Sequence, residues 1–139
     1  SEDYYTIEIG KASLLKEGND ITIITYGAGV HWALDTLKTH PNISADLIDL
    51  RTLQPLDEAA IFTSVRKTGK VIFLQEDSLF GSMSSDVSAL ITENCFEFLD
   101  APVKRVASIE TPIPFQGELE KQYLPKHRFA SELKTLIDY

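Results

Sequence analysis

Short apolar runs alternate along the chain with longer segments whose apolar residues recur at helical spacing. The apolar runs predict five strands, at 11–16, 21–26, 45–50, 70–74 and 103–107. The helical spacing predicts helices at about 30–39, 58–68, 81–98 and, after an irregular stretch with three prolines, 126–137. Alternating strands and helices favour right-handed crossovers and a mostly parallel sheet covered on both faces. The pattern therefore predicts an α/β protein with three layers, α/β/α.

The first two predicted strands are joined only by a short turn at Gly18-Asn19-Asp20. Parallel strands need a crossover of a dozen or more residues, so the first strand is expected to run against the others. The result is a five-stranded mixed sheet with the first strand antiparallel. No repeat, low-complexity tract or linker divides residues 1–139, and we expect a single domain. The chain begins with Ser1, which leads us to expect a fragment of a longer chain.

The second predicted helix carries clear signals at both ends. Pro55 stops backbone pairing of the preceding strand, and Asp57 is placed to cap the helix. Leu56 and Ile61 stand at the two positions of a hydrophobic staple. Gly69 suits the left-handed residue that closes such a helix.

Composition narrows the classes of function. A net charge of −8 argues against nucleic-acid binding, since phosphate attracts clustered lysine and arginine. The same charge permits a basic protein partner, although plain solubility explains it equally. No stretch approaches the roughly 18 apolar residues of a membrane helix, and no signal peptide is evident. A single cysteine, Cys95, excludes an internal disulfide, and we expect a cytoplasmic protein.

Gly27-Ala28-Gly29 is the first candidate for chemistry, because it lies between a strand and a helix where amide groups favour an anion. A dinucleotide fingerprint needs a third glycine at position 32, which is Trp32. A tight turn is therefore the favoured interpretation. A free-standing anion-binding module remains an alternative.

Other candidates have equally simple explanations. His31, His40 and His127 have no partner at metal-ligand spacing, and Cys95 lies on an apolar helical face. The Glu76-Asp77 pair lies in a predicted loop at the carboxyl edge of the sheet, where open α/β folds place ligands. It has four interpretations: hydrogen bonding across an interface, acid–base chemistry, capping of the next helix, or solvation. The residues alone predict no catalytic, cofactor-binding or metal-binding site.

A sparse acidic set lies on or just after the third long helix. Asp86, Glu93 and Glu97 are spaced by seven and four residues, which predicts a shared helical face, and Asp100 follows. A solvated face of an amphipathic helix is the simplest interpretation of this spacing.

Four groups of residues, in this order, resemble one family: Asp49-Leu50-Arg51-Thr52-Leu53-x-Pro55, Lys67-Thr68-Gly69-Lys70, Leu99-Asp100-Ala101-Pro102-Val103-x-Arg105-Val106 and Thr111-Pro112-x-Pro114. The family is the C-terminal domain of the beta subunit of thiamine-diphosphate-dependent 2-oxoacid dehydrogenases, and more broadly the transketolase C-terminal domain fold. Residues 5–12 and 136–139 resemble the same family, so the match covers nearly the whole chain. Residues 93–102 look most similar to the branched-chain (2-oxoisovalerate) member.

The resemblance implies an oxidoreductase subunit whose reaction centre lies elsewhere. In this family the diphosphate of the cofactor, thiamine diphosphate, and its magnesium are held by the alpha subunit, or by the alpha half of a fused chain, and the aminopyrimidine is held by the preceding domain of the beta part. This chain alone is therefore expected to be inactive. The implied role is assembly with the alpha subunit, a second beta copy and the basic peripheral subunit-binding domain of the dihydrolipoyl acyltransferase. The implied docking residues are Asp100, just before Ala101-Pro102, and the final Tyr139.

Two further alternatives remain within the resemblance. The chain also fits the beta subunit of pyruvate dehydrogenase, or the equivalent domain of a transketolase-like synthase that needs no acyltransferase. The resemblance has one departure, because relatives commonly carry two adjacent glycines where this chain has Phe80-Gly81-Ser82-Met83.

Overall fold

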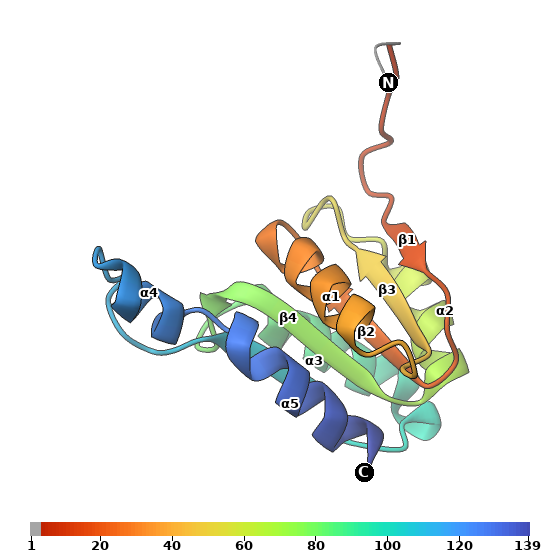
Figure 1. The fold of residues 1–139 in the computed structure, drawn as a ribbon. Coiled ribbons are helices and arrows are strands. Elements are labelled where there is room, and N and C mark those ends of the chain that lie inside the picture. The colour runs from red at the N-terminus through yellow and green to blue at the C-terminus, as the bar shows by residue number, and fades with distance from the viewer. Residues whose placement is uncertain (1–3) are drawn as a thin grey trace.

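The computed structural model describes residues 4–139 and has a five-stranded sheet at its centre (Figure 1). The strand order is β1-β3-β2-β4-β5, in which β1 pairs antiparallel with β3 and every other neighbouring pair is parallel. The predicted mixed sheet with a reversed first strand is therefore confirmed. The strands are β1 (Ser13–Lys16), β2 (Ile21–Thr25), β3 (Ala45–Asp49), β4 (Val71–Ser78) and β5 (Lys104–Ser108).

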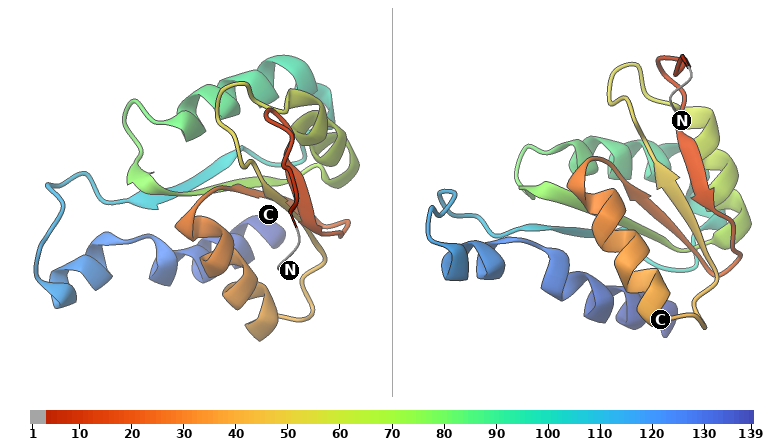
Figure 2. Two further views of the ribbon diagram at one scale, coloured as in Figure 1. Left: turned by 90° about the horizontal axis from the view of Figure 1, so that it is seen from above. Right: turned by 45° about the horizontal axis from the view of Figure 1, so that its top comes forward.

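Helices cover both faces of the sheet (Figure 2). α1 and α5 contact each other on one face, and α2 and α3 contact each other on the other face. The predicted three layers are thus confirmed. The helices are α1 (Ala28–Thr39), α2 (Glu58–Thr68), α3 (Met83–Cys95), a 3-10 turn η1 (Phe96–Phe98), α4 (Gly117–Tyr123) and α5 (Lys126–Ile137).

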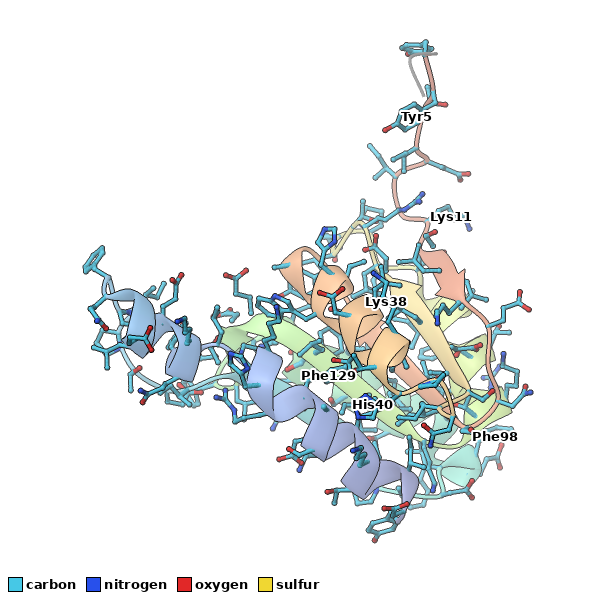
Figure 3. The ribbon with its side chains drawn as sticks, viewed as in Figure 1. Tyr5, Lys11, Lys38, His40, Phe98 and Phe129 are labelled. Carbon is cyan, nitrogen blue, oxygen red and sulfur yellow. The ribbon has the colours of Figure 1, made fainter. Side chains whose placement is uncertain are left out.

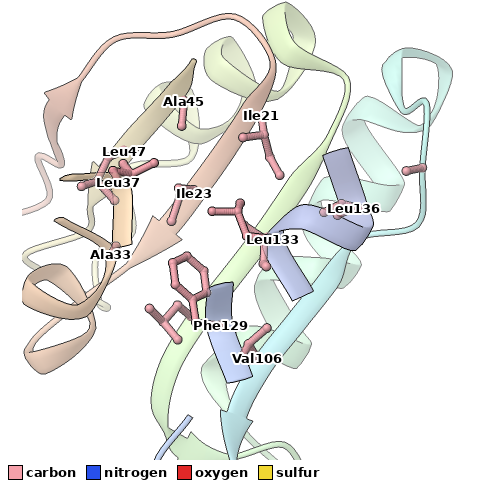
Figure 4. Close-up of a cluster of buried hydrophobic side chains, with 13 residues drawn as sticks. Ile21, Ile23, Ala33, Leu37, Ala45, Leu47, Val106, Phe129, Leu133 and Leu136 are labelled. Carbon is pink, nitrogen blue, oxygen red and sulfur yellow. The ribbon is translucent and has the colours of Figure 1, made fainter. Parts of the chain in front are cut away.

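Two separate hydrophobic clusters hold these layers together. On the α1 and α5 face, Phe129 and Leu133 of α5 meet Ile23 of β2 and Ala33 of α1 (Figure 4). On the α2 and α3 face, the buried side chains come from strands and helices alike: Ile24, Ile48, Leu50, Ile61, Val65, Val71, Phe73, Val87, Ile91 and Cys95. Each strand in the middle of the sheet contributes to both clusters, because neighbouring side chains point to opposite faces.

The predicted signals of α2 are all found in the structure. The carboxylate of Asp57 accepts a hydrogen bond of 3.2 Å from the backbone N–H of Ala60. Gly69 closes the helix with a φ of 69°, and its N–H bonds to the carbonyl of Val65. Ile61 is buried in the second cluster, and Leu56 packs against that cluster.

The main differences from the sequence-based prediction concern β4, α3 and α4. β4 continues through Ser78, so Glu76 and Asp77 belong to a strand rather than a loop. α3 ends at Cys95 and gives way to η1, so the long helix predicted to about residue 98 is shorter. α4 lies in the stretch predicted to be irregular, because three of its seven residues are charged and seven residues are too few to show apolar periodicity.

Two segments stand away from the layered body (Figure 1). The N-terminal arm, residues 4–9, extends beyond β1 and is exposed along its length. Figure 3 places Tyr5 out on this arm, on the opposite side of the molecule from Phe98. α4 and the loop before it project from the carboxyl end of β5 (Figure 2). Within residues 4–139 no helix combines the length and apolarity that a membrane crossing requires.

Candidate functional site

The candidate site lies at the amino edge, which we define as the edge of the sheet where the parallel strands begin. The segment Lys67-Thr68-Gly69-Lys70, one of the groups that carried the resemblance, passes along this edge between α2 and β4. Each of its four residues bonds to a different part of the chain. We call residues 67–70 the latch, because their bonds join α2 to β2, β3, the Asp100 segment and the end of α5.

Lys67 reaches a buried carboxylate on β3. Its Nζ lies 2.6 Å from Oδ1 of Asp46, whose side chain is only 2% exposed. The same carboxylate accepts bonds from the N–H of Gly18 (2.9 Å) and the hydroxyl of Ser64 (2.6 Å). Burial alone would raise the pKa of Asp46, but these bonds outweigh it and hold the pKa below its ordinary value. A buried charge is tolerated here because it is paired and fully hydrogen-bonded.

The polar network continues through hydroxyl groups beneath α2. Oγ1 of Thr22 lies 2.6 Å from Oγ of Ser64 and 2.7 Å from Oγ1 of Thr68. All three side chains are buried. Gly18 is required in this arrangement, because a Cβ there would lie 2.2 Å from the backbone N of Ala45. The turn before β2, the start of β3 and the end of α2 are therefore joined at one place.

Asp100 stands directly against the latch. Its N–H donates a 2.8 Å bond to the carbonyl of Gly69, which fixes its backbone at the start of the segment leading into β5. Its carboxylate lies over the Cα of Gly69, since a Cβ on that glycine would be 2.3 Å from Oδ2. The side chain is exposed, and it has no ion pair within 4 Å among the described residues. Asp100 thus presents an available anion from a fixed backbone.

Tyr139 lies at the same edge. Lys70 donates a 2.5 Å bond from Nζ to the carbonyl of Ile137, which attaches the end of α5 to the latch. The Tyr139 side chain follows two residues later and is 73% exposed. Ala101 and Leu136 are buried in the same hydrophobic cluster, which independently links the Asp100 segment to the end of α5. The two residues proposed from the sequence therefore come from distant parts of the chain to one edge.

A third group at this edge is aromatic and basic. The guanidinium of Arg66 lies 5.7 Å from the ring centre of Phe98 and 6.0 Å from that of Phe62. These cation–π contacts attach η1 to α2. Phe98 is visible at the edge in Figure 3. The guanidinium of Arg66 thus packs against the two rings and forms no ion pair with the carboxylate of Asp100.

The remaining sequence candidates do not gather at this edge. Asp86 and Glu93 are exposed on α3, but Glu97 belongs to η1, so the predicted single acidic face is interrupted. Glu76 and Asp77 lie at the opposite edge and do not cap α3, whose first residue follows Ser82. Among the described residues no three His, Cys, Asp or Glu side chains come close enough to hold a metal ion.

The glycine candidates are explained by local geometry. Gly27 has a φ of 57°, which favours glycine, and it precedes the first residue of α1. Gly29 has no room for a side chain, because a Cβ would lie 2.1 Å from Oγ1 of Thr25. Both observations support the tight-turn interpretation of this segment.

The signal that sequence reasoning missed is Asp46. An aspartate inside an otherwise apolar strand is unusual, and burial of such a residue requires partners. Its partners Gly18, Ser64 and Lys67 are far away in sequence, so their contribution becomes visible only in the folded chain.

Comparisons with known proteins agree with this architecture. The sequence-family model of the transketolase C-terminal domain matches residues 10–128 of this chain. The beta subunit of 2-oxoisovalerate dehydrogenase from Bacillus subtilis is 46% identical over 88% of this chain and 38% of its own length. The beta subunit of acetoin:2,6-dichlorophenolindophenol oxidoreductase from the same organism is 45% identical over 89% of this chain and 37% of its own length.

A solved structure shows the same arrangement of elements. The beta4 tetramer described as an inactive split gene transketolase aligns with a TM-score of 0.79 and 29% identity, over 96% of this chain and 43% of that chain.

The chain belongs to the transketolase C-terminal domain family. Within that family, its similarity to beta subunits of 2-oxoacid dehydrogenases confirms the resemblance noted in its motifs. The chain spans less than two fifths of the length of the two curated relatives, 37% and 38%.

Proposed function

We propose that this chain is the C-terminal assembly domain of the beta part of a branched-chain 2-oxoacid (2-oxoisovalerate) dehydrogenase. It contributes subunit contacts and docks the dihydrolipoyl acyltransferase at the amino edge. The observation that carries the proposal is the exposed carboxylate of Asp100, fixed by its backbone bond to Gly69 beside the end of α5. The 46% identity with a 2-oxoisovalerate dehydrogenase beta subunit supports the substrate class.

Electrostatics favour a basic partner at this edge. The net charge of −8 attracts a basic domain over long range, and Asp100 supplies a local anion. A carboxylate that meets an arginine forms charge-assisted bonds that are often bidentate. Truncating one partner of such a pair costs about 2–5 kcal/mol when the pair is buried, and much less on a wet rim. Tyr139 adds an exposed ring at the same edge of the sheet, of the kind enriched in interface cores.

We place the chemistry outside this chain. In the proposed enzyme the alpha subunit or alpha half binds the diphosphate and magnesium, and the preceding domain of the beta part binds the aminopyrimidine. Residues 1–139 form one domain of the longer beta chain. The domain contacts the alpha subunit and a second beta copy, and the enzyme acts in the cytoplasm. We expect residues 1–139 alone to decarboxylate no 2-oxoacid, as measured by release of carbon dioxide in the presence of thiamine diphosphate and magnesium.

The docking role is tested with the full-length beta chain in its assembled enzyme. Isothermal titration with the isolated subunit-binding domain should show that Asp100→Lys weakens affinity at least about tenfold. The matched control is Asp86→Lys, which makes the same charge change at an exposed site on α3. We expect the control to change affinity less than about twofold. Equal affinities for wild type and Asp100→Lys would refute the docking role.

The substrate class is tested separately with the same assembled enzyme. Decarboxylation rates with 2-oxoisovalerate and pyruvate, and the oxidation rate with acetoin, should rank 2-oxoisovalerate first. A clear preference for pyruvate would assign the chain to the pyruvate dehydrogenase type. Turnover of acetoin alone would instead match the relative that is 45% identical.

A further inference from the structure

The opposite edge of the sheet, where the parallel strands end, contains a pocket that the proposed docking role does not use. β2 leads through α1 to β3 on one side, whereas β4 leads through α3 to β5 on the other. The carboxyl ends of β2 and β4 therefore flank the switch point of the sheet, the place where open α/β folds leave a crevice. A pocket of about 340 Å³ lies there, between Tyr26 after β2, Glu76 and Asp77 on β4, and Glu120 and Tyr123 on α4.

An irregularity in β4 holds the two acidic residues in place. β4 pairs with β5 at Leu74 and again at Ser78, with a shift in register between them. Gln75 donates a 2.7 Å bond to the carbonyl of Ser78, and Ser108 donates to the carbonyl of Glu76. These bonds use backbone groups and leave both carboxylates exposed. A β-bulge that redirects side chains is a common feature of functional sites.

The pocket is negatively charged and lacks an internal cation. None of Glu76, Asp77 and Glu120 takes part in an ion pair among the described residues. Arg128 is nearby, but its guanidinium donates to the carbonyls of Ala107, Gln122 and Tyr123. Burial, together with the charges of Asp77 and Glu76, raises the pKa of the Tyr26 phenol. The pocket therefore offers three carboxylates to a positive group from outside.

An apolar rim, which we define as Ile113, Phe115 and Leu119, lies on the chain segment that leads along this acidic pocket. Ile113 lines the pocket, and Phe115 and Leu119 follow in sequence, before and within α4, which projects from the body (Figure 1). All three side chains are exposed, Phe115 fully. Exposed large apolar side chains close together along the chain mark surfaces that are covered by another protein. A small amine would fill the pocket but leave the rim in water.

We propose that this surface receives a lysine or arginine side chain, flanked by apolar residues, from another subunit of the enzyme. The aliphatic stem of such a side chain fits between Tyr26, Tyr123 and Leu124, and its charge reaches the carboxylates. At this pocket a second copy of this chain is disfavoured, because it would bring a further net charge of −8 to three carboxylates; the contact with a second beta copy uses another surface. A domain bound at Asp100 occupies the other edge of the sheet. This inference rests on the proposed function, because it takes the chain to be part of a multisubunit enzyme.

The test uses the full-length beta chain and, as the probe, the purified alpha subunit of the same enzyme. The variant Glu76→Gln/Asp77→Asn/Glu120→Gln removes three exposed charges. The control Asp35→Asn/Glu93→Gln/Glu132→Gln also removes three charges, at carboxylates on α1, α3 and α5 that do not line the pocket. Sedimentation velocity should show alpha binding weakened at least about tenfold by the first variant and less than about threefold by the control. Phe115→Ser should weaken the same binding with unchanged urea unfolding.

The outcomes separate this inference from the docking role. The pocket variant should bind the acyltransferase subunit-binding domain with wild-type affinity, and Asp100→Lys should bind the alpha subunit normally. A pocket variant that binds the alpha subunit within threefold of wild type overturns the inference, even when Asp100→Lys behaves as proposed. A wild-type chain that does not bind the alpha subunit also overturns it. Loss of self-association without loss of alpha binding would assign the surface to a second copy, against the proposal.

Discussion

The two edges of the sheet differ in how their polar groups are used. At the amino edge, the buried carboxylate of Asp46 is bonded to Lys67, Ser64 and Gly18, and the latch bonds to Asp100 and to the end of α5. At the carboxyl edge, Glu76 and Asp77 remain exposed, and the projecting α4 carries apolar side chains into solvent. At the first edge a buried, paired carboxylate holds the fold together, whereas at the second edge the exposed carboxylates of Glu76 and Asp77 form no ion pair among the described residues.

The Thr25 hydroxyl illustrates the same difference inside the protein. Thr25, the last residue of β2, has a buried Oγ1 with no hydrogen-bond partner among the described residues. At the start of the same strand, Thr22 bonds to both Ser64 and Thr68. The two threonines therefore contribute differently to the free energy of unfolding. The hydrogen bonds of Thr22 offset the cost of burying its hydroxyl, whereas Thr25 has no bond that offsets this cost.

The largest effect is expected for Asp46→Ala at the amino edge. The substitution removes a buried ion pair and leaves the N–H of Gly18 and the hydroxyl of Ser64 without an acceptor. We expect the free energy of unfolding to fall by about 3 kcal/mol, measured by urea denaturation. The control is Asp35→Ala, which breaks an exposed pair with Lys38 and should cost less than about 1 kcal/mol. Equal losses for the two variants would show that the buried pair of Asp46 contributes no more to stability than an exposed one.

The carboxylate of Asp46 should also make the stability of the fold depend on pH. Because the folded-state pKa of Asp46 lies below its unfolded value, its contribution to stability is present above about pH 4 and is lost as the pH falls through the folded pKa. The stability difference between wild type and Asp46→Asn should therefore shrink steadily on acidification below that point. A difference that stayed constant down to acid unfolding would show that the charge of Asp46 contributes nothing.

Gly69→Ala should have an intermediate effect. The left-handed φ of 69° costs an L-residue about 1–2 kcal/mol, and the new methyl group displaces the carboxylate of Asp100. Gly117→Ala is the matched control on α4, because its Cβ meets nothing within 4 Å. Urea unfolding should show a loss for the first variant and no loss for the second. Titration with the subunit-binding domain should also weaken for Gly69→Ala, and an unchanged affinity would place Asp100 outside the docking contact.

Thr25→Val, at the carboxyl edge, should increase the free energy of unfolding. Replacing an unpaired buried hydroxyl by a methyl group removes a desolvation cost, and we expect unfolding to require up to about 1 kcal/mol more. Thr22→Val, at the satisfied end of the same strand, should instead lose stability because Ser64 and Thr68 lose a partner. Urea denaturation of both variants measures the difference, and the same sign for both would contradict it.

The smallest effect on stability is expected for Phe115→Ser. The side chain is fully exposed, so the free energy of unfolding should change by less than about 0.5 kcal/mol. Self-association of the isolated chain should nevertheless decrease, because an exposed aromatic side chain is removed from the rim. Light scattering across a concentration series measures this. A strong loss of stability would mean that α4 packs against the body in solution.

The sequence predicted the features that depend on local signals. Asp57 and Gly69 determine the ends of α2 through short-range capping, and the short turn at Gly18-Asn19-Asp20 determines the direction of β1. These effects act within a few residues, so periodicity and turn chemistry reveal them.

The sequence did not reveal features that depend on distant contacts. Residues 75–78 are polar and read as a loop, but pairing of Ser78 with Ser108 keeps them in β4. Asp46 looked like an ordinary strand residue, since its partners come from other elements. Asp100 and Tyr139 were taken from the family resemblance, and only the latch explains why they share an edge.

The two outermost strands have a consequence for the behaviour of the isolated domain. β1 has only four residues with a break in register between Leu14 and Lys16, and β5 begins with Lys104 and Arg105. Short, kinked and cationic outer strands are poor templates for adding a further strand from another molecule. Fibril growth by lateral strand pairing is therefore discouraged at both sides, and aggregates of this domain should form through side chains and dissolve again in mild detergent.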